Sequence, residues 1–486
     1  MKILQVASEA VPLCKTGGLA DVVTALSQTL ASQGDDVRVL IPAYAGVLAR
    51  VAVERHIELG DPLGVGHRAR VCIARVPDSP LEWWLLQCDP LFDRPGGPYG
   101  DPSGVDWPDN HLRFGLLARA AAMLAIGGAA LGHPVDVVHT HDWQAALAAG
   151  YLAWWGRGRP ASVLTVHNLQ FAGRFALQLA GALALPPAAV TPAGLEFYGE
   201  LSLLKAGLVW ADRVTTVSPT YADEIRTPEG GIGFDGLLRH RGDAVVGILN
   251  GIDEATWDPR TDAALPARFD ANHLEDKQRC RAALQRELGL APQTHAPVLG
   301  LVGRLTWQKG IDLVLEAVEV SLAQGAQLVV LGSGEPALEQ ALDQLVALHP
   351  LAVAHRRGYD EALSHRIFAG ADLFLVPSRF EPCGLTQMYA MRYGTPPVVR
   401  RTGGLADTVI DEDERPGAGS GFVFDAPTAP ALAAALQRAT STWRDRAHHE
   451  DVQRRGMARA FGWREGAGAY RRVYREAIAH RDAEQP

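Results

Sequence analysis

The sequence predicts an α/β protein built from two Rossmann-like domains that face a cleft. Apolar runs of strand length alternate with helical patterns through the first half of the chain. This alternation stops at a turn-rich segment, residues 250–259, and restarts at residue 297. The length of 486 residues also exceeds what one hydrophobic core usually supports.

The first half is expected to form a parallel sheet covered by helices on both faces, because its strands are separated by helices. The predicted strands are residues 2–7, 37–41, 71–76, 83–87, 135–139, 162–166, 213–217 and 245–249, with 71–76 and 83–87 forming a hairpin. The predicted helices are residues 19–33, 113–126 and 143–155.

The second half repeats this organisation after a domain boundary that we place near residue 250. A polar helix is predicted at residues 274–288 and another helix at 311–322. The predicted strands are residues 297–303, 327–331, 351–354, 372–376 and 397–400. From Trp443 onward the chain is helical and rich in arginine, and we expect a solvated helical face there.

The composition is that of an ordinary soluble globular protein, with 47% hydrophobic and 21% charged residues. The net charge of −9 argues against nucleic acid as a partner. The five cysteines are scattered, which favours a reducing compartment and gives neither a zinc site nor a disulfide framework. The chain enters a strand at once, without a signal peptide, and has no apolar run long enough for a bilayer. We therefore expect a cytoplasmic protein with no membrane partner.

A glycine pair near the start lies where the first strand gives way to a helix. Gly17 and Gly18 would let a ligand approach the unpaired N–H groups of the helix, and Lys15 adds a positive charge. This pattern predicts a phosphate-binding loop, and a tight turn with a solvated lysine remains an equal alternative.

Two loops of the second half also follow strand ends. Arg304 and Lys309 could straddle a diphosphate, Arg304 as a bidentate fork and Lys309 as a point charge. In the other loop Glu381 could accept hydrogen bonds from sugar hydroxyls, and residues 384–386 could present backbone donors to a phosphate. Surface charges are the alternative in both places, but the strand-end position favours function.

Three further patterns point away from a cofactor or a metal. Residues 332–337 match a dinucleotide fingerprint, but they follow the second strand of their half and lack the acidic partner of a ribose. Residues 411–413 look like a solvated charged loop. His141 and His167 have no evident third ligand, so hydrogen bonding is the preferred role. No metal and no nicotinamide are expected.

The segment at residues 16–21, TGGLAD, recurs at residues 402–407. The first copy follows the first strand of its half and the second copy follows a late strand, which is not what gene duplication would produce. We interpret the repeated segment as one kind of strand-to-helix turn used twice. The second copy could also face the ligand.

Several motifs of this sequence resemble bacterial glycogen synthases and the related starch synthases. They are KTGGLAD at 15–21, HDW at 141–143, TVHN at 165–168, NGID at 250–253, GRLTWQKG at 303–310, PSRFEPCGLTQ at 377–387 and RRTGGLAD at 400–407. They span nearly the whole chain in the order of the family, and KTGGLAD and SRFEPCGLTQ are specific to it.

The resemblance implies a GT-B glycosyltransferase with domains at residues 1–250 and 251–459 and a C-terminal helix, 460–486, that packs back onto the first domain. The first domain would face the acceptor and the second would bind the nucleotide sugar. The reaction implied is retaining transfer of glucose from ADP-glucose to the non-reducing end of an α-1,4-glucan such as glycogen, without a metal or cofactor.

The resemblance also assigns residues to that site. Arg304 and Lys309 would bind the diphosphate, and Glu381 would hold glucose hydroxyls. The residues implied as catalytic are Lys15, His167, Arg304, Lys309 and Glu381. Those implied as substrate-binding are Gly18, Asp21, Asp142, Asn250, Tyr359, Cys383, Gly384, Leu385 and Thr386, with Tyr359 stacking on the adenine. Tyr389 stands where many enzymes of this fold have a second glutamate, so ribose must be recognised by another residue.

Alternatives to this function remain. The residues do not distinguish ADP-glucose from UDP-glucose, since both nucleobases would meet the same loops. A non-catalytic glucan-binding protein would not need the cationic loops, which are present here. A glycan phosphorylase would need a pyridoxal phosphate lysine, and no motif for one is found.

Overall fold

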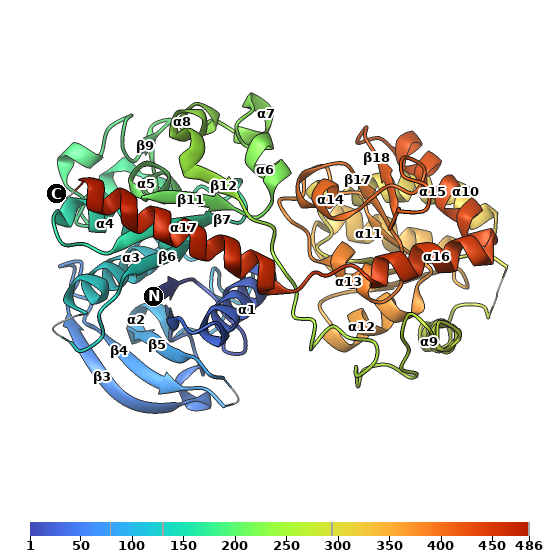
Figure 1. Cartoon of the computed structure of the whole chain (residues 1–486), viewed down its shortest axis with the longest axis horizontal. Coiled ribbons are helices and arrows are strands. Elements are labelled where there is room, and N and C mark those ends of the chain that lie inside the picture. The colour runs from blue at the N-terminus through green and yellow to red at the C-terminus, as the bar shows by residue number, and fades with distance from the viewer. Residues whose placement is uncertain (78, 129–130, 293–294, 485–486) are drawn as a thin grey trace. The chain divides into compact units, whose positions relative to one another are not determined.

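The computed structural model describes residues 1–77, 79–128, 131–292 and 295–484 of the chain. The chain forms two compact units (Figure 1). Unit 1 joins Met1–Gly251 to Trp463–Pro486, and unit 2 is Ile252–Gly462. Each unit has its own sheet and its own hydrophobic core.

Unit 1 is organised around a nine-stranded sheet with the strand order β12-β11-β7-β6-β1-β2-β5-β4-β3. Neighbours from β12 to β5 are parallel, whereas β5, β4 and β3 pair antiparallel. The strands are β1 (Lys2–Val6), β2 (Asp36–Pro42), β3 (Ala52–Gly60), β4 (Ala69–Arg75), β5 (Glu82–Gln87), β6 (Val137–His141), β7 (Ala161–Val166), β11 (Arg213–Thr216) and β12 (Val245–Gly247). A small antiparallel sheet adds β8 (Arg174–Ala176), β9 (Glu196–Phe197) and β10 (Glu200–Ser202).

The parallel strands and the β4–β5 hairpin confirm the predicted class, and the structure adds an antiparallel edge strand, β3, that was not predicted. The sequence analysis missed β3 because most of its side chains are exposed. An exposed edge strand carries no buried apolar run by which a sequence pattern could identify it.

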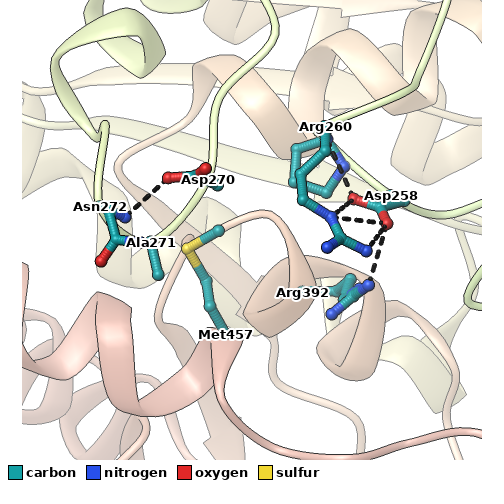
Figure 2. A pocket seen from close by; sticks show the side chains of 8 residues that line it. Asp258, Arg260, Asp270, Ala271, Asn272, Arg392 and Met457 are labelled. Carbon is teal, nitrogen blue, oxygen red and sulfur yellow. Dashed lines mark hydrogen bonds and ion pairs between the residues drawn. The ribbon is translucent and has the colours of Figure 1, made fainter.

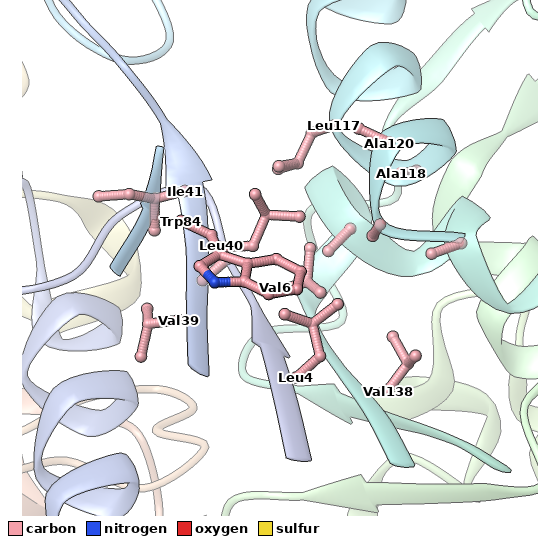
Figure 3. Close-up of a cluster of buried hydrophobic side chains, with 14 of the residues drawn as sticks. Leu4, Val6, Val39, Leu40, Ile41, Trp84, Leu117, Ala118, Ala120 and Val138 are labelled. Carbon is pink, nitrogen blue, oxygen red and sulfur yellow. The ribbon is translucent and has the colours of Figure 1, made fainter. Parts of the chain in front are cut away.

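Two groups of helices cover the sheet of unit 1. α17 packs against α1 and against β6, β7 and β11, while α3 and α4 pack together against β1, β2, β6 and β7. The helices are α1 (Gly18–Ser32), α2 (Asp89–Phe92), α3 (Asn110–Gly127), α4 (Asp142–Trp155), α5 (Leu203–Trp210), α6 (Pro219–Glu224), α7 (Pro228–Gly231), α8 (Asp235–Arg241) and α17 (Trp463–Glu484). Figure 3 shows how successive side chains of β2 alternate between the two faces of the sheet: Leu40 points toward α3, and Val39 and Ile41 point the opposite way.

The last helix, α17, completes the core of unit 1. Its buried side chains recur every three or four positions and include Trp463, Ala467, Tyr470, Val473, Tyr474 and Ala477. The solvated face expected from its arginine content is therefore only one side of this helix, because one complete apolar stripe faces the sheet.

Unit 2 contains a six-stranded, fully parallel sheet with the order β15-β14-β13-β16-β17-β18. Its strands are β13 (Val298–Val302), β14 (Gln327–Leu331), β15 (Val353–Arg356), β16 (Leu373–Val376), β17 (Pro397–Arg400) and β18 (Phe422–Phe424). Its helices are α9 (Glu275–Glu287), α10 (Ile311–Ala323), α11 (Pro336–Leu348), α12 (Glu361–Gly370), α13 (Thr386–Arg392), α14 (Gly403–Thr408), α15 (Ala429–Arg444) and α16 (Arg446–Met457). Each predicted strand of this half is present within about two residues of its expected ends.

The strand β6 begins two residues later than predicted, at Val137. His139 and His141 therefore lie inside the strand, on the same face, and Asp142 begins α4 directly. This shift brings two histidines into the core of unit 1 that the sequence analysis had placed at or beyond a strand end.

Candidate functional site

The glycine loop of unit 1 is longer than a tight turn. β1 ends at Val6 and α1 begins at Gly18, with Lys15 and the two glycines exposed at the end of the intervening loop. Lys15 forms an ion pair with Asp21, the acidic residue in the first turn of α1, at 3.0 Å. The lysine is therefore paired as well as solvated, and exposed backbone N–H groups lie beside it at the start of a 15-residue helix.

A carboxylate that the sequence analysis did not select holds this loop in place. Glu9, nearly fully buried, accepts hydrogen bonds from the backbone N–H of Thr16 and from its Oγ1, the latter at 2.9 Å. The hydroxyl of Tyr99 donates to the same carboxylate at 2.8 Å. Thr16 is thereby fixed next to Lys15. No periodic signal marks Glu9, because it lies in the loop.

Asp142 and His167 come together at the carboxyl ends of β6 and β7. The Asp142 Oδ1 atom accepts hydrogen bonds from the backbone N–H of His167 at 2.7 Å and of Asn168 at 3.4 Å. Asp142 adopts a left-handed backbone conformation with φ of 54°. Burial raises the pKa of this carboxyl to about 7, although both N–H donors act in the opposite direction.

The imidazole of His167 faces a second histidine. Nε2 of His167 lies 2.9 Å from Nδ1 of His141, whose Nε2 lies 2.9 Å from Oε1 of Gln5. Burial lowers the pKa of His167 to about 3 and the pKa of His141 well below its ordinary value, so both rings are neutral at physiological pH. This agrees with the hydrogen-bonding role preferred from the sequence.

Asn250, next to the end of the first segment of unit 1, is a buried polar residue. Its side chain is about 5% exposed, and its Oδ1 atom has no hydrogen-bond partner among the described residues. A buried amide oxygen without a partner is costly, and it is an available acceptor for a ligand.

In unit 2 two of the predicted site residues, Lys309 and Glu381, form an ion pair. Lys309 Nζ lies 2.5 Å from Oε2 of Glu381, and the hydroxyl of Ser378 donates to the same oxygen at 2.8 Å. Glu381 is about 6% exposed, whereas a quarter of the Lys309 side chain remains accessible. The ammonium therefore has a fixed position and still reaches solvent.

The loops that carry these two groups are tied together by an arginine that the sequence analysis did not select. Arg379 binds Asp312 of α10 through two hydrogen bonds of 2.7 and 2.6 Å. Its guanidinium also lies 4.4 Å from the ring centre of Trp307. Arg379 thus joins the loop after β16 to the loop after β13.

Glycines explain why the loop of Arg304 can lie where it does. A side chain at Gly332 would overlap the carbonyl oxygen of Gly303, and one at Gly334 would overlap that of Leu305. Backbone hydrogen bonds then join Leu305 to Ser333 and Glu335, at 3.0 and 2.8 Å. The glycines of the rejected dinucleotide fingerprint therefore serve loop-to-loop packing.

The second glycine pair, Gly403 and Gly404, also allows one loop to pack closely against another. Gly403, at a φ of 43°, lies against the carbonyl of Glu381, and Gly404 lies against the carbonyl of Cys383. The N–H of Gly404 donates to the carbonyl of Glu381 at 3.1 Å. The second TGGLAD segment thus packs against the backbone of the loop that carries Glu381.

The remaining predicted residues of unit 2 differ in exposure. Cys383 is buried, Gly384 takes a left-handed conformation with φ of 71°, and α13 begins directly after Leu385. Arg304 is exposed at the start of the Lys309 loop. Tyr359 is 66% exposed and its hydroxyl donates to Glu361 at 2.6 Å.

Tyr389, in contrast, is buried. Its ring stacks on Trp257 at 3.8 Å between centroids, and it therefore contributes to the core.

A pocket of about 220 Å³ in unit 2 contains none of the predicted residues (Figure 2). Asp258 pairs there with Arg260 at 2.5 Å and with Arg392 at 3.2 Å. Asp270 accepts from the backbone N–H of Asn272 at 2.8 Å. Asp258 is thus shared by two arginines, and the charge partner of Asp270 is His273, at 2.9 Å.

The expectation that residues 411–413 form a solvated charged loop is wrong for two of the three residues. Asp411 and Glu412 are buried rather than solvated, and Arg438 and Arg455 pair with them. Structural ion pairs, rather than a metal or a solvated loop, account for this segment.

Within the described ranges, one group of side chains has the spacing of a metal site: Asp212, His480 and Glu484. Arg159 already binds Asp212 at 2.7 Å and lies 3.5 Å from Glu484. A fixed guanidinium opposes a metal cation there. In the same ranges, no helix combines the length and hydropathy needed to cross a membrane.

Two family models match the chain. The model described as "Starch synthase catalytic domain" matches residues 2–240, and the one described as "Glycosyl transferases group 1" matches residues 289–455. Together they cover most of both units.

Curated relatives match over nearly the full length. A glycogen synthase of Methylocella silvestris is 47% identical over 484 residues, covering 99% of each chain. One of Alkalilimnicola ehrlichii is 49% identical and covers 98% of each chain. Among solved structures, the catalytic domain of starch synthase IV from Arabidopsis thaliana, bound to ADP and acarbose, is 32% identical with a TM-score of 0.88, covering 98% of this chain and 99% of that one.

Proposed function

Because the chain belongs to the glycogen and starch synthase family of glycosyltransferases, we propose that it transfers glucose from ADP-glucose to the non-reducing end of an α-1,4-glucan with retention at the anomeric carbon. The observation that carries the choice of donor is the similarity, over 98% of the chain, to a starch synthase whose structure holds ADP and acarbose. The family membership itself fixes only a glycosyltransferase that builds glucan.

In this proposal unit 2 binds the nucleotide sugar. The barrier is the departure of a charged ADP, which fixed cations aimed at the developing charge would lower. Arg304 and Lys309 supply these cations, and Glu381 accepts from glucose hydroxyls while it holds Lys309 in place. The accessible ammonium of Lys309 supports this role.

The backbone of the Glu381 loop would contact the phosphates, and a nearby aromatic ring would contact the base. Among the described residues, the N–H groups of Gly384 and Leu385 donate to no protein acceptor, which leaves them for the distal phosphate. Cys383 and Thr386 flank these donors. The exposed ring of Tyr359 offers a stacking surface for adenine.

Unit 1 would hold the transferring sugar and the acceptor. Lys15 and Gly18 contribute a positive charge and helix N–H groups at the phosphate, with Asp21 orienting the lysine. Asp142, His167 and Asn250 would line the sugar subsite, where the unpaired Oδ1 of Asn250 is an acceptor for a hydroxyl. No metal or cofactor enters this mechanism, because side-chain cations supply the positive charge.

We also propose a cytoplasmic location. Within the part of the chain that the structure describes, none of the five cysteines forms a disulfide, which suits a reducing compartment.

The test is incorporation of labelled glucose into glycogen from ADP-glucose and UDP-glucose in parallel assays. ADP-glucose is expected to be the better donor. A clear preference for UDP-glucose would replace the donor assignment, and incorporation from neither donor would favour a glucan-binding protein without catalytic activity. Product anomers resolved by NMR test retention, since a β-linkage would contradict it.

A further inference from the structure

A continuous chain of hydrogen bonds crosses the core of unit 1 and ends at the ring of His167. It begins at the backbone carbonyl of Leu164 and passes through strands β11, β7, β6 and β1 and helix α17. Its side chains, in order, are Thr215, Thr165, His139, Tyr474, Gln5, His141 and His167, and all but the last are fully buried.

The first end of the chain gives it a direction. The carbonyl of Leu164 can only accept, and Thr215 Oγ1 donates to it at 3.4 Å. Because that hydroxyl has one hydrogen, the contact of 2.6 Å between Thr215 and Thr165 has Thr165 as the donor. Thr165 must then accept from Nε2 of His139, which lies 2.6 Å away.

The direction continues through the aromatic hydroxyl and the amide. A neutral His139 with its hydrogen on Nε2 accepts at Nδ1 from the hydroxyl of Tyr474, at 2.8 Å. The Tyr474 oxygen in turn accepts from the amide NH₂ of Gln5 at 3.3 Å. The amide oxygen of Gln5 is thereby the atom that faces His141.

The last two contacts follow from the orientation of Gln5. Its oxygen accepts from Nε2–H of His141 at 2.9 Å, which leaves Nδ1 of His141 as an acceptor. That acceptor takes the hydrogen of Nε2 of His167 at 2.9 Å. The second nitrogen of His167, Nδ1, is then unprotonated.

The argument requires three neutral rings, since a protonated imidazole has two donors and no acceptor. Burial supplies this condition. It lowers the pKa of His139 and of His167 to about 3, and it lowers that of His141 well below its ordinary value. Each ring then has one donor and one acceptor.

We propose that this chain fixes His167 as the Nε2–H tautomer, so that Nδ1 is a hydrogen-bond acceptor for a hydroxyl group of the transferred sugar, with Gln5, His141 and Tyr474 as positioning residues. The tautomer is a property of the protein alone. Its use by a sugar rests on the proposed glucosyl transfer.

Two tyrosine variants of α17 test the chain. Tyr470 and Tyr474 are both fully buried on the same helix, but the hydroxyl of Tyr470 lies beside the path rather than in it, 3.3 Å from Oγ1 of Thr165. Tyr474→Phe removes both the donor to His139 and the acceptor for Gln5, and so frees the Gln5 amide to turn over. Tyr470→Phe is the matched control, because it leaves every bond of the path in place.

The first measurement is the imidazole ¹⁵N spectrum of the free protein labelled in histidine, with His167 assigned by its loss in His167→Asn. Wild type and Tyr470→Phe are expected to show the unprotonated nitrogen of His167 at Nδ1. Tyr474→Phe and Gln5→Leu are expected to show both tautomers. A hydrogen on Nδ1 in wild type, or an unchanged spectrum in Tyr474→Phe, would overturn the proposal even if Gln5→Leu fails to fold.

The second measurement compares ADP-glucose with analogues that each lack one hexose hydroxyl. Tyr474→Phe is expected to lower kcat by about tenfold, the scale on which loss of an orienting partner acts at other sites. It should also weaken discrimination against one deoxy analogue, whereas a purely structural defect would slow all donors alike. Equal slowing would refute the sugar contact. Failure of wild type to use ADP-glucose would refute the proposed function while leaving the tautomer result intact.

Discussion

The two units hold their candidate site residues by different physical means. In unit 2 the groups are charged and paired, Lys309 with Glu381 and Arg379 with Asp312. In unit 1 the candidate residue His167 is a neutral histidine at the end of a buried hydrogen-bond chain. Unit 2 is therefore suited to act through an electric field, and the histidine of unit 1 through the placement of single hydrogens. Lys15 of unit 1, paired with Asp21, belongs with the charged groups of unit 2 in this comparison.

The difference implies different responses to substitution. Removing a charge in unit 2 changes the field at a leaving group and leaves a partner uncompensated. Removing one member of the chain in unit 1 leaves the net charge unchanged and alters which atom donates. Four predictions follow this contrast in order of decreasing effect.

The largest effect is expected for the cations. Lys309→Ala, Arg304→Ala and Lys15→Ala should each lower turnover with ADP-glucose at least about a hundredfold, since one such group typically contributes about 2.7–4 kcal/mol to the transition state. Glucose incorporation into glycogen measures this. Arg454→Ala, which removes an exposed arginine paired with Glu450 on α16, is the control and should retain its rate.

A double variant separates catalysis from structure at Lys309. Lys309→Ala alone leaves Glu381 buried without its cation and should also lower stability. Lys309→Ala combined with Glu381→Gln should recover stability in urea denaturation but not turnover. Recovery of turnover would mean that Lys309 serves only to neutralise Glu381.

The second effect concerns pH. Burial raises the pKa of Asp142 to about 7, whereas an aspartate in an unfolded chain titrates near 3.9. Between about pH 4 and pH 7 the folded state binds more protons, so the free energy of unfolding contributed by this group falls as pH rises and is lowest above pH 7. Asp142→Asn should abolish this fall.

At pH 8 Asp142→Asn should be more stable than wild type by roughly 2–4 kcal/mol, because each pKa unit corresponds to about 1.4 kcal/mol. At pH 4 the two proteins should be similar. Urea denaturation at both values measures this, with the exposed Asp106→Asn as control. An equal stability difference at the two pH values would contradict the raised pKa.

A smaller effect is expected for the arginine that joins the two loops of unit 2. Arg379→Lys loses the bidentate pair with Asp312 and the contact with Trp307, and lysine replaces neither fully. We expect a stability loss of about 1 kcal/mol, since the pair is partly exposed. The KM for the donor should rise several-fold. Arg454→Lys, at an exposed pair, should change neither.

The smallest effect is expected for chelators. The proposal assigns the positive charge to side chains, so EDTA should leave the rate of glucose incorporation unchanged over several hours. A loss that added Mg²⁺ or Mn²⁺ restores would show that a metal takes part, and that the charged side chains are not the sole source of the positive charge.

The sequence predicted the elements with buried, regular patterns. β14 is fully buried and apolar after its first residue, and the pattern located it without error. β3 escaped because its side chains are exposed, and the start of β6 was misplaced by two residues. Pattern reasoning depends on burial, so it fails at edges and ends.

The site shows the same limit at longer range. Lys309 and Glu381 lie 72 residues apart, and strand-end positions alone suggested that both serve one site. Tyr474 lies 335 residues from His139, and no local pattern connects them. The arginine content of the final helix suggested solvation, and only the family resemblance implied that the helix packs onto the first domain. Its apolar stripe at three- and four-residue spacing was the signal in the residues themselves that we did not use.

The final helix has a consequence for synthesis on the ribosome. Unit 2 can finish folding as soon as Gly462 has emerged, although unit 1 begins to emerge first. Until Tyr470 and Tyr474 leave the exit tunnel, the face of β6 and β7 that they cover stays open in the nascent chain. The half that is translated first is thus the last to mature, and a stop codon just after residue 462 would spare unit 2 while leaving unit 1 with an uncovered apolar face.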